Sequence, residues 1–117
     1  MGNVTEKVKT EGTVLAIAAY KPKEGQEEAL MELVRRHLPT LRELQLATDK
    51  TGYLSRSTDG TVIEVFEWTS TNAINAAHQH PAMVDIWEKM AIVADFPPMS
   101  ALPEANRPFP GFEIIGE

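Results

Sequence analysis

One acidic side chain stands inside a hydrophobic segment, where it could carry out acid–base chemistry. Glu64 lies in the run Thr61–Trp68, which is otherwise mainly apolar. A carboxylate in an apolar cavity holds its proton more tightly than in water and can act as a general base. The alternative is a structural carboxylate that accepts a hydrogen bond from Ser55 or Tyr53, or that pairs with Arg56 of a partner copy.

The three histidines do not have the spacing of a metal site. His78 and His80 stand two residues apart, and side chains at that spacing point to nearly opposite sides of a helix. His37 falls in an amphipathic segment, where we expect it to be partly exposed beside the apolar stripe and without a functional role. The chain has no cysteine, so a thiolate zinc site, thiol catalysis and a disulfide framework are excluded. We predict no metal site.

Hydrophobic patterning predicts the elements that must position these side chains. Val14–Tyr20 is a continuous apolar run, which indicates a strand buried on both faces. Gly25–Leu46 carries apolar residues at three- and four-residue spacing, which indicates an amphipathic helix. Pro39 removes a backbone donor from this helix, so we expect a kink or a break near Leu38.

A second helical region begins at a cap formed by Ser70 or Thr71 and is interrupted at His80-Pro81. Pro81 suits the first position of the resumed helix, because its missing N–H would have no partner there. A proline-rich loop at residues 95–111 and a last strand at Phe112–Ile115 follow. The apolar face predicted for the resumed helix contains Met83, Val84, Trp87, Met90, Ala91 and Ala94.

The predicted order of elements is β-α-β-β-α-β in a chain of 117 residues. This order is typical of the α+β class with a ferredoxin-like arrangement, an antiparallel sheet with both helices packed on one face. A chain of this length makes one domain. We therefore predict a single domain over residues 1–117, with an N-terminal extension at 1–12. The loop at 95–111 would be a lid or a strap across a dimer.

The turn between the two middle strands decides which side chains share a face. Asp59-Gly60 fits a two-residue type I′ hairpin, which places Ser55 opposite Glu64. Side chains alternate between the two faces of a sheet. One face would present Leu54, Ile63 and Val65 to the helices. The other face would carry Tyr53, Ser55, Glu64, Phe66 and Trp68.

The second of these faces is too apolar to be left in water, and the helices cannot cover it from the opposite side. A second copy of the sheet would cover it, so we predict a homodimer closed sheet against sheet around a cavity between the subunits. Trp68 would stack on a flat ligand there or pack as a core aromatic at the interface. The predicted ligand-binding residues are Tyr53, Ser55, Phe66 and Trp68.

The overall charge argues against several classes of partner. Eleven basic and 17 acidic residues give a net charge of −6, whereas nucleic acid binding needs a basic face. No apolar run approaches the ~20 residues of a membrane span. The first eleven residues mix lysine and glutamate and do not resemble a signal peptide. We expect a cytoplasmic protein with neither nucleic acid nor membrane as a partner.

The negative charge is concentrated in the second half of the chain. Residues 1–58 carry nine basic and eight acidic side chains (+1), and residues 59–117 carry two and nine (−7). This half is either a solvated surface that aids solubility or a field around the site. Such a field would favour neutral or cationic ligands over anionic ones.

The middle of the chain also resembles a known family. The stretch Glu64-Val65-Phe66-Glu67-Trp68-Thr69-Ser70, followed by Ala73, Ala77-His78 and Pro81, resembles the antibiotic-biosynthesis-monooxygenase-like family of dimeric α+β barrels. The similarity in layout covers residues 14–94, and the similarity in motif covers residues 64–84. Related barrels include cofactor-free oxygenases of polycyclic phenols, haem-degrading enzymes, isomerases and stress-induced proteins.

The resemblance implies a small-molecule-binding barrel that acts as a cofactor-independent monooxygenase on a flat phenolic substrate. Glu64 or His78 would remove a phenolic proton, the substrate would react directly with oxygen, and Trp68 and Tyr53 would orient it. His78 would otherwise be a helix-end histidine bonded to a carbonyl, or a ligand of haem iron. The alternatives are a non-catalytic or stress-associated binding barrel and a haem-binding protein.

Overall fold

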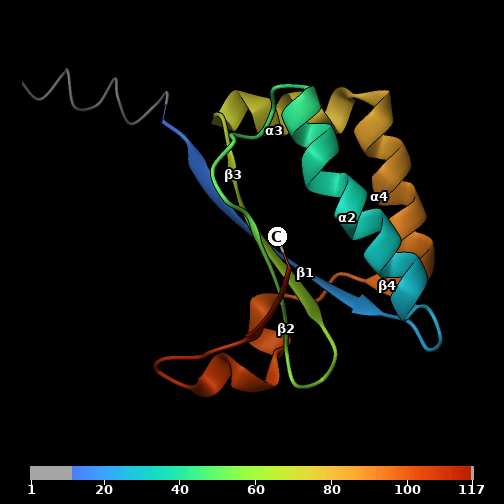
Figure 1. Cartoon of the computed structure of the whole chain (residues 1–117), viewed down its shortest axis with the longest axis vertical. Helices are drawn as coiled ribbons and strands as arrows, with labels where there is room; N and C mark the ends of the chain where they lie inside the picture. Colours follow the sequence, from blue (N-terminus) through green and yellow to red (C-terminus); the bar gives the residue numbers. More distant parts are fainter. Residues whose placement is uncertain (1–11, 117) are drawn as a thin grey trace, which may run out of the picture.

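The computed structural model describes residues 12–116, which form an α+β fold (Figure 1). Within that range five strands make one antiparallel sheet in the order β4-β1-β3-β2-β5, and three α-helices accompany it. The predicted α+β class is confirmed, and the architecture is compatible with a ferredoxin-like arrangement. The predicted extension at 1–12 lies outside the described residues except for residue 12. None of the helices between residues 12 and 116 has the length and apolar character that a membrane span requires.

The centre of the sheet is an antiparallel pair formed by β1 (Val14–Pro22) and β3 (Val62–Trp68). β2 (Tyr53–Arg56) pairs with the other edge of β3. Both central strands are rich in β-branched or small apolar residues, which fit a pleated surface that is covered by helices. The apolar run at 14–20 is confirmed as a strand, but it is not buried on both faces, because Leu15 and Ile17 are 67% and 50% exposed.

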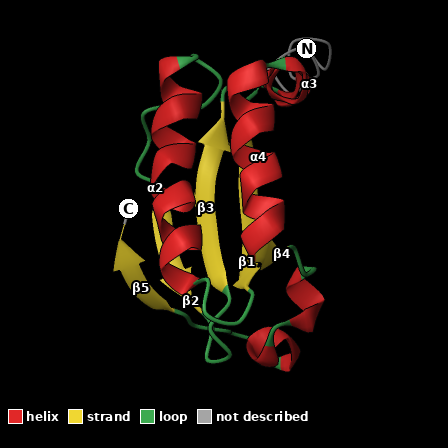
Figure 2. Ribbon diagram, turned by 90° about the vertical axis from the view of Figure 1, so that its right-hand side faces the viewer, coloured by secondary structure: helices red, strands yellow, loops and turns green. Residues whose placement is uncertain are grey.

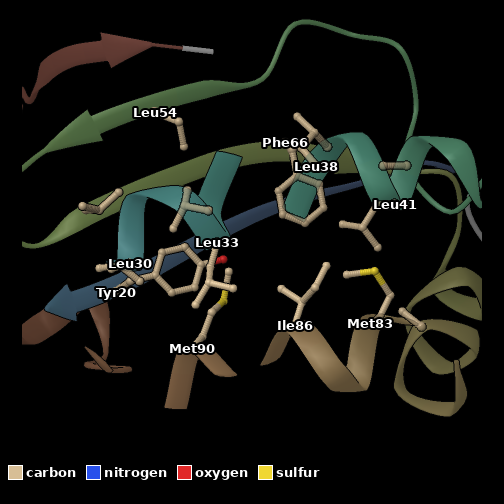
Figure 3. Packing of buried hydrophobic residues seen from close by; sticks show 14 of the residues in the cluster. Tyr20, Leu30, Leu33, Leu38, Leu41, Leu54, Phe66, Met83, Ile86 and Met90 are labelled. Atoms are coloured by element: carbon tan, nitrogen blue, oxygen red, sulfur yellow. The ribbon is translucent and has the colours of Figure 1, made fainter. Parts of the chain in front are cut away.

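The helices α2 (Glu27–Glu43), α3 (Thr71–Gln79) and α4 (Pro81–Val93) lie on one face of the sheet, as Figure 2 shows. Each turn of α2 and α4 places apolar side chains on the side that faces the strands. These side chains interlock with each other and with side chains of the sheet (Figure 3). The cluster includes Leu30, Leu33, Leu38 and Leu41 of α2, Met83, Ile86 and Met90 of α4, and Leu54 and Phe66 of the sheet.

The predicted interruption at His80-Pro81 is confirmed, and it separates α3 from α4. A side chain caps the N-terminus of each of these helices. Ser70 Oγ accepts a hydrogen bond from the Ala73 N–H at 3.0 Å at the start of α3. His80 Nδ1 accepts one from the Ala82 N–H at 3.1 Å at the start of α4. Pro81 lies in the first turn of α4, where proline is tolerated. His80 therefore has a structural role as a helix cap.

Helix α2 continues through Pro39, so the break expected as one outcome near Leu38 is not found. Pro39 is exposed, whereas Leu38 and Leu41 on either side of it are buried in the core. The apolar stripe of α2 therefore stays packed on the sheet across the proline. Packing of an amphipathic face supplies most of a helix's stability in a protein, and here it outweighs one lost backbone hydrogen bond.

The hairpin between β2 and β3 has a three-residue loop rather than the predicted two-residue loop. The Ser57 N–H donates to the Thr61 carbonyl at 2.8 Å, and the Gly60 N–H donates to the Ser57 carbonyl at 3.0 Å. Gly60 has a φ of 91°, a left-handed conformation that glycine adopts readily. This conformation at the last loop position is typical of three-residue hairpins.

The extra loop residue shifts the pairing of β2 by one position and corrects the predicted faces. Ser55 lies opposite Ile63, and Leu54 lies opposite Glu64. A shift of one residue moves every side chain of a strand to the other face relative to its neighbour. Glu64, Phe66 and Trp68 therefore share the helix-covered face with Leu54, and Tyr53, Ser55, Ile63 and Val65 share the opposite face.

Both edges of the sheet are formed by strands from the C-terminal part of the chain. The last strand, β5 (Glu113–Gly116), pairs with β2 at one edge. A short strand that the patterning did not predict, β4 (Ala94–Asp95), pairs with β1 at the other edge. Between them the proline-rich loop forms two 3₁₀ helices, η1 (Met99–Ala101) and η2 (Pro103–Asn106), beyond one end of the sheet (Figure 2).

Candidate functional site

Glu64 is the central polar group of the layer between sheet and helices. It lies in the middle of β3 and is 1% exposed. The Tyr20 hydroxyl donates a hydrogen bond to Glu64 Oε1 at 2.7 Å. His37 Nδ1, from α2, lies 2.9 Å from the same oxygen. The carboxylate is thus held by side chains of the sheet and of the helix layer, and neither Ser55 nor Tyr53 is its partner.

His37 was expected to be partly exposed and without a role, and the structure contradicts the first expectation. Its side chain is 3% exposed and faces Glu64 on one side and Trp87 on the other. The Trp87 indole N–H donates to His37 Nε2 at 2.9 Å, so this nitrogen is an acceptor. A neutral imidazole has one acceptor and one N–H. The proton is therefore assigned to Nδ1, which faces Glu64.

Tyr20 is a second residue of this network that the sequence analysis did not single out. It ends the apolar run of β1 and is buried. Burial, together with the negative charge and hydrogen bond of Glu64, raises the pKa of the Tyr20 hydroxyl well above its ordinary value. The hydroxyl therefore remains protonated and serves as a donor to Glu64. We call Tyr20, His37, Glu64 and Trp87 the polar network.

A pocket of about 430 Å³ that is open to solvent on one side lies beside the polar network, and we call it the aromatic cavity. Ala16 and Ala18 lie on β1 opposite Phe66 and Glu64. Their small side chains leave room between the sheet and the helices, and larger rings surround it. The cavity is lined by Ala16, Ala18, Tyr20, His37, Phe66, Trp68, His78, Trp87 and Phe96.

The rings around the aromatic cavity form a connected set. Neighbouring ring centroids lie 4.9–6.4 Å apart, with tilted or edge-to-face geometry. These distances are those of favourable aromatic pairs. The chain of contacts runs from Phe96 through Tyr20 to His37, and then to Phe66 and Trp68 on one side and Trp87 and His78 on the other.

The structure brings four of the six predicted site residues together and separates the other two from them. Phe66, Trp68 and His78 line the aromatic cavity, and Glu64 lies in the polar network beside it. Tyr53 is 48% exposed on the opposite face of the sheet. Ser55 lies on that face too, and its hydroxyl lies 3.5 Å from the Ile63 carbonyl. Neither Tyr53 nor Ser55 lines the cavity.

His78 lies in the last turn of α3 and is exposed, unlike His37. Its ring packs against the Trp87 ring with a centroid distance of 4.9 Å. It therefore lines the outer part of the aromatic cavity, whereas His37 is buried in its wall. His78 is thus open to solvent, whereas His37 is isolated from it.

The proline-rich loop contributes one wall of the cavity and is fastened within the same chain. Phe96 follows β4 directly, and its ring lies 5.9 Å from that of Tyr20. Glu104 is 2% exposed and accepts hydrogen bonds from the Ser57 hydroxyl at 2.7 Å and the Thr58 N–H at 3.0 Å. The bonds from Thr58 and Ser57 hold the pKa of Glu104 below its ordinary value. The loop is thereby attached to the β2–β3 hairpin.

The chemistry available to these residues is that of proton transfer and aromatic stacking. Between residues 12 and 116 no group of three or more histidine, aspartate or glutamate side chains is arranged to hold a metal ion. No family model matches this chain, and a search of curated proteins finds no match either.

Proposed function

We propose that this protein binds a flat, mainly apolar small molecule in the aromatic cavity. The observation that carries the proposal is the cavity itself, about 430 Å³ with seven rings among its lining residues. This volume falls in the range of small-molecule sites, which are mostly apolar with a few placed polar groups. Rings such as Trp68 and Phe66 can stack on a planar ligand. The small alanines of β1 provide the space that the ligand fills.

The proposed reaction is the cofactor-independent oxygenation of a phenolic substrate. Glu64 holds the Nδ1 proton of His37 and would stabilise the imidazolium that forms when Nε2 accepts a substrate proton. His78, at the outer part of the cavity, is a second base that can exchange protons with water. The proposal thus keeps Glu64 and His78 as catalytic candidates and adds His37 between them.

The reaction balances without a bound metal or organic cofactor. A phenol whose keto tautomer carries a ring methylene loses a proton to the base and becomes electron-rich. Dioxygen then oxidises the methylene carbon to a carbonyl. One oxygen atom becomes the carbonyl oxygen, and the other leaves as water with the two hydrogens of that carbon.

A non-catalytic binding protein is the second candidate, and one contact favours it. His37 Nε2 already accepts a hydrogen bond from Trp87, so the nitrogen that would act as the base is occupied within the protein. A base in that state must first lose the Trp87 contact before it can take a proton from a substrate. A protein that only retains its ligand needs no such step.

The proposal includes a homodimer closed sheet against sheet, which would complete a dimeric α+β barrel. Part of the face of the sheet opposite the helices is apolar and exposed, with Leu15 67%, Ile17 50% and Ile114 66% exposed, whereas Ala19, Ser55 and Ile63 on the same face are buried. A contiguous exposed apolar face is typical of an interaction surface. In this assembly each aromatic cavity lies within one subunit, between its sheet and its helices, rather than between the subunits.

Oxygen consumption tests the catalytic form of the proposal. Anthrone, a three-ring ketone with a ring methylene, is incubated with the protein, and dioxygen uptake is compared with the uncatalysed rate. We expect the acceleration to fall by about a hundredfold in His37→Ala and Glu64→Gln, because a general base contributes that much or more. His80→Asn, which alters a helix-capping histidine outside the cavity, should retain the native rate.

The same purified protein distinguishes the alternatives. Native mass spectrometry that finds a retained small molecule, with no oxygen uptake on any polycyclic phenol, would favour a non-catalytic binding protein. Addition of haemin tests the haem alternative, since coordination by His78 would produce a Soret band that His78→Ala lacks. We expect no such band.

A further inference from the structure

The polar groups of Tyr20, His37, Glu64 and Trp87 lie against one another beside the aromatic cavity. Glu64 Oε1 accepts from the Tyr20 hydroxyl and faces the Nδ1 proton of His37. The remaining acceptor of His37 is the single lone pair on Nε2, and it takes the indole N–H of Trp87 at 2.9 Å. Because His37 and Trp87 both line the cavity, this contact is the place where a ligand can enter the network.

The two partners of this contact differ in how easily they can do without it. His37 is 3% exposed and lines the cavity, so once a ligand fills the cavity its Nε2 atom is shut off from water and needs a donor from the protein or from that ligand. Trp87 is only partly buried, and its ring lies against the exposed His78. If the contact breaks, the Trp87 N–H can therefore turn toward water at little cost. The Nε2 atom of His37 cannot do so.

We propose that Trp87 caps the acceptor of the empty cavity and that flat ligands with a hydrogen-bond donor, such as a phenol, an enol or an N–H heterocycle, bind by exchanging places with its N–H. The donor of the ligand replaces the Trp87 N–H on His37 Nε2. The inference depends on the proposed function, since it requires that the aromatic cavity bind a flat ligand. It adds the chemical class of that ligand and makes Trp87 a specificity-determining residue.

Replacing Trp87 should change the affinity differently for ligands with and without a donor. In the native protein a ligand without a donor leaves the Trp87–His37 contact in place, so it suffers no penalty there. When Trp87 is replaced by phenylalanine, such a ligand seals Nε2 in the cavity without a partner. A ligand with a donor satisfies Nε2 in both proteins. The preference for the donor should therefore increase when Trp87 is removed.

The experiment compares 2-naphthol with 2-methoxynaphthalene, which has the same rings but no donor. Equilibrium dialysis gives both dissociation constants for the native protein, Trp87→Phe and Phe96→Leu. We expect the ratio of the two constants to rise about tenfold in Trp87→Phe, the typical effect of one unsatisfied buried acceptor. Phe96→Leu changes a ring of the same cavity without a hydrogen-bonding group and should leave the ratio as in the native protein.

A measurement on the unaltered protein guards against a misfolded variant. The indole N–H of Trp87 is followed by ¹H–¹⁵N NMR while each ligand is added. The two ligands have similar ring currents, so a larger shift with 2-naphthol than with 2-methoxynaphthalene reports displacement of Trp87 from His37. Equal shifts would argue against displacement and overturn the inference.

The outcomes separate this inference from the proposed function. If both ligands bind but their ratio is the same in the native protein and in Trp87→Phe, the cavity binds flat molecules and the donor preference is refuted. If neither ligand binds at millimolar concentration, the inference and the proposed function both fail. A tenfold rise confined to Trp87→Phe supports both.

Discussion

His37 Nδ1 lies 2.9 Å from Glu64 Oε1, and neither side chain is more than 3% exposed. The contact joins α2 to the centre of the sheet, between two layers that otherwise meet through apolar side chains. A buried carboxylate is tolerated only when donors satisfy it. Tyr20 donates a hydrogen bond, His37 Nδ1 lies within ion-pair distance of the same oxygen without hydrogen-bond geometry, and the aromatic cavity opens beside them.

Replacing Glu64 by leucine should destabilise the fold. The change leaves the Tyr20 hydroxyl and the His37 Nδ1 proton buried without an acceptor. Each such group costs about 1–3 kcal/mol, so we expect the free energy of unfolding in urea to fall by about 2–6 kcal/mol. Glu67→Leu, in the same strand but on the face away from the helices, should change it by less than about 1 kcal/mol. Equal stabilities for the two variants would contradict the polar network.

The stability of the native protein should decline above about pH 10. The pKa of Tyr20 is raised well above the value of 10.0 that an unperturbed tyrosine has, first by burial and then by Glu64. Below pH 10 the hydroxyl is protonated in both states, and the stabilisation is fully present. Above pH 10 the unfolded chain loses this proton while the folded protein retains it, so the free energy of unfolding decreases as pH rises.

The check is urea unfolding between pH 8 and pH 11.5. Tyr20→Phe should be less stable at pH 8 and should lose part of the alkaline decline. Tyr53→Phe is the matched control, because Tyr53 is the other tyrosine and is half-exposed. An alkaline decline that disappears in Tyr53→Phe and persists in Tyr20→Phe would contradict the assignment.

The choice of turn explains why part of the site could be predicted and part could not. Alternation along β3 places Glu64, Phe66 and Trp68 on one face whatever the pairing partner. The faces of β2 depend on the loop, and Asp59-Gly60 suits a two-residue or a three-residue hairpin because glycine adopts a left-handed conformation in both. A two-residue loop would place Tyr53 and Ser55 on the face of Glu64. The three-residue loop of the structure places them on the opposite face.

His37 shows a second limit of reasoning from the sequence. It stands four residues after Leu33 and four before Leu41, so its spacing places it in the apolar stripe of α2. Its polarity suggested exposure, but its partners Glu64 and Trp87 come from β3 and α4. No local pattern connects these three residues, because the packing of the layers brings them together.

The proline-rich loop should loosen when Glu104 is removed. In Glu104→Ala the Ser57 hydroxyl and the Thr58 N–H lose the acceptor that attaches the loop to the hairpin. We expect faster hydrogen exchange, relative to intrinsic rates, at the amides of Ala105 and Arg107, which are bonded within η2. Glu113→Ala, an exposed acidic residue in β5, should leave these rates unchanged.

The same attachment should weaken in acid. Hydrogen bonds from Thr58 and then Ser57 lower the pKa of Glu104 below the ordinary 4.5, so its contribution is fully present above pH 4.5. It is lost as the pH falls through the lowered value in the folded protein. Protection of Ala105 and Arg107 that is the same at pH 3 and pH 7, after correction for intrinsic exchange, would argue against Glu104 as the attachment.

Charge on the uncovered face of the sheet should disrupt the proposed dimer. Ile17→Asp places a carboxylate in the apolar patch, so light scattering after size-exclusion chromatography should give one chain of 13.0 kDa instead of two. Ile92→Asp is the control, because Ile92 is also exposed (72%, against 50% for Ile17) but belongs to α4, on the other side of the sheet. A native protein that is monomeric at micromolar concentration would refute the dimer while leaving the cavity intact.

The central claim is that a flat ligand occupies the space above Ala16 and Ala18, and filling that space tests it most directly. We predict that the native protein binds 2-naphthol in equilibrium dialysis and that Ala16→Leu weakens the affinity at least tenfold. Ala76→Leu, an equally sized change on the exposed surface of α3, should bind like the native protein. Equal affinities for the native protein and Ala16→Leu, or no binding by either, would contradict the account.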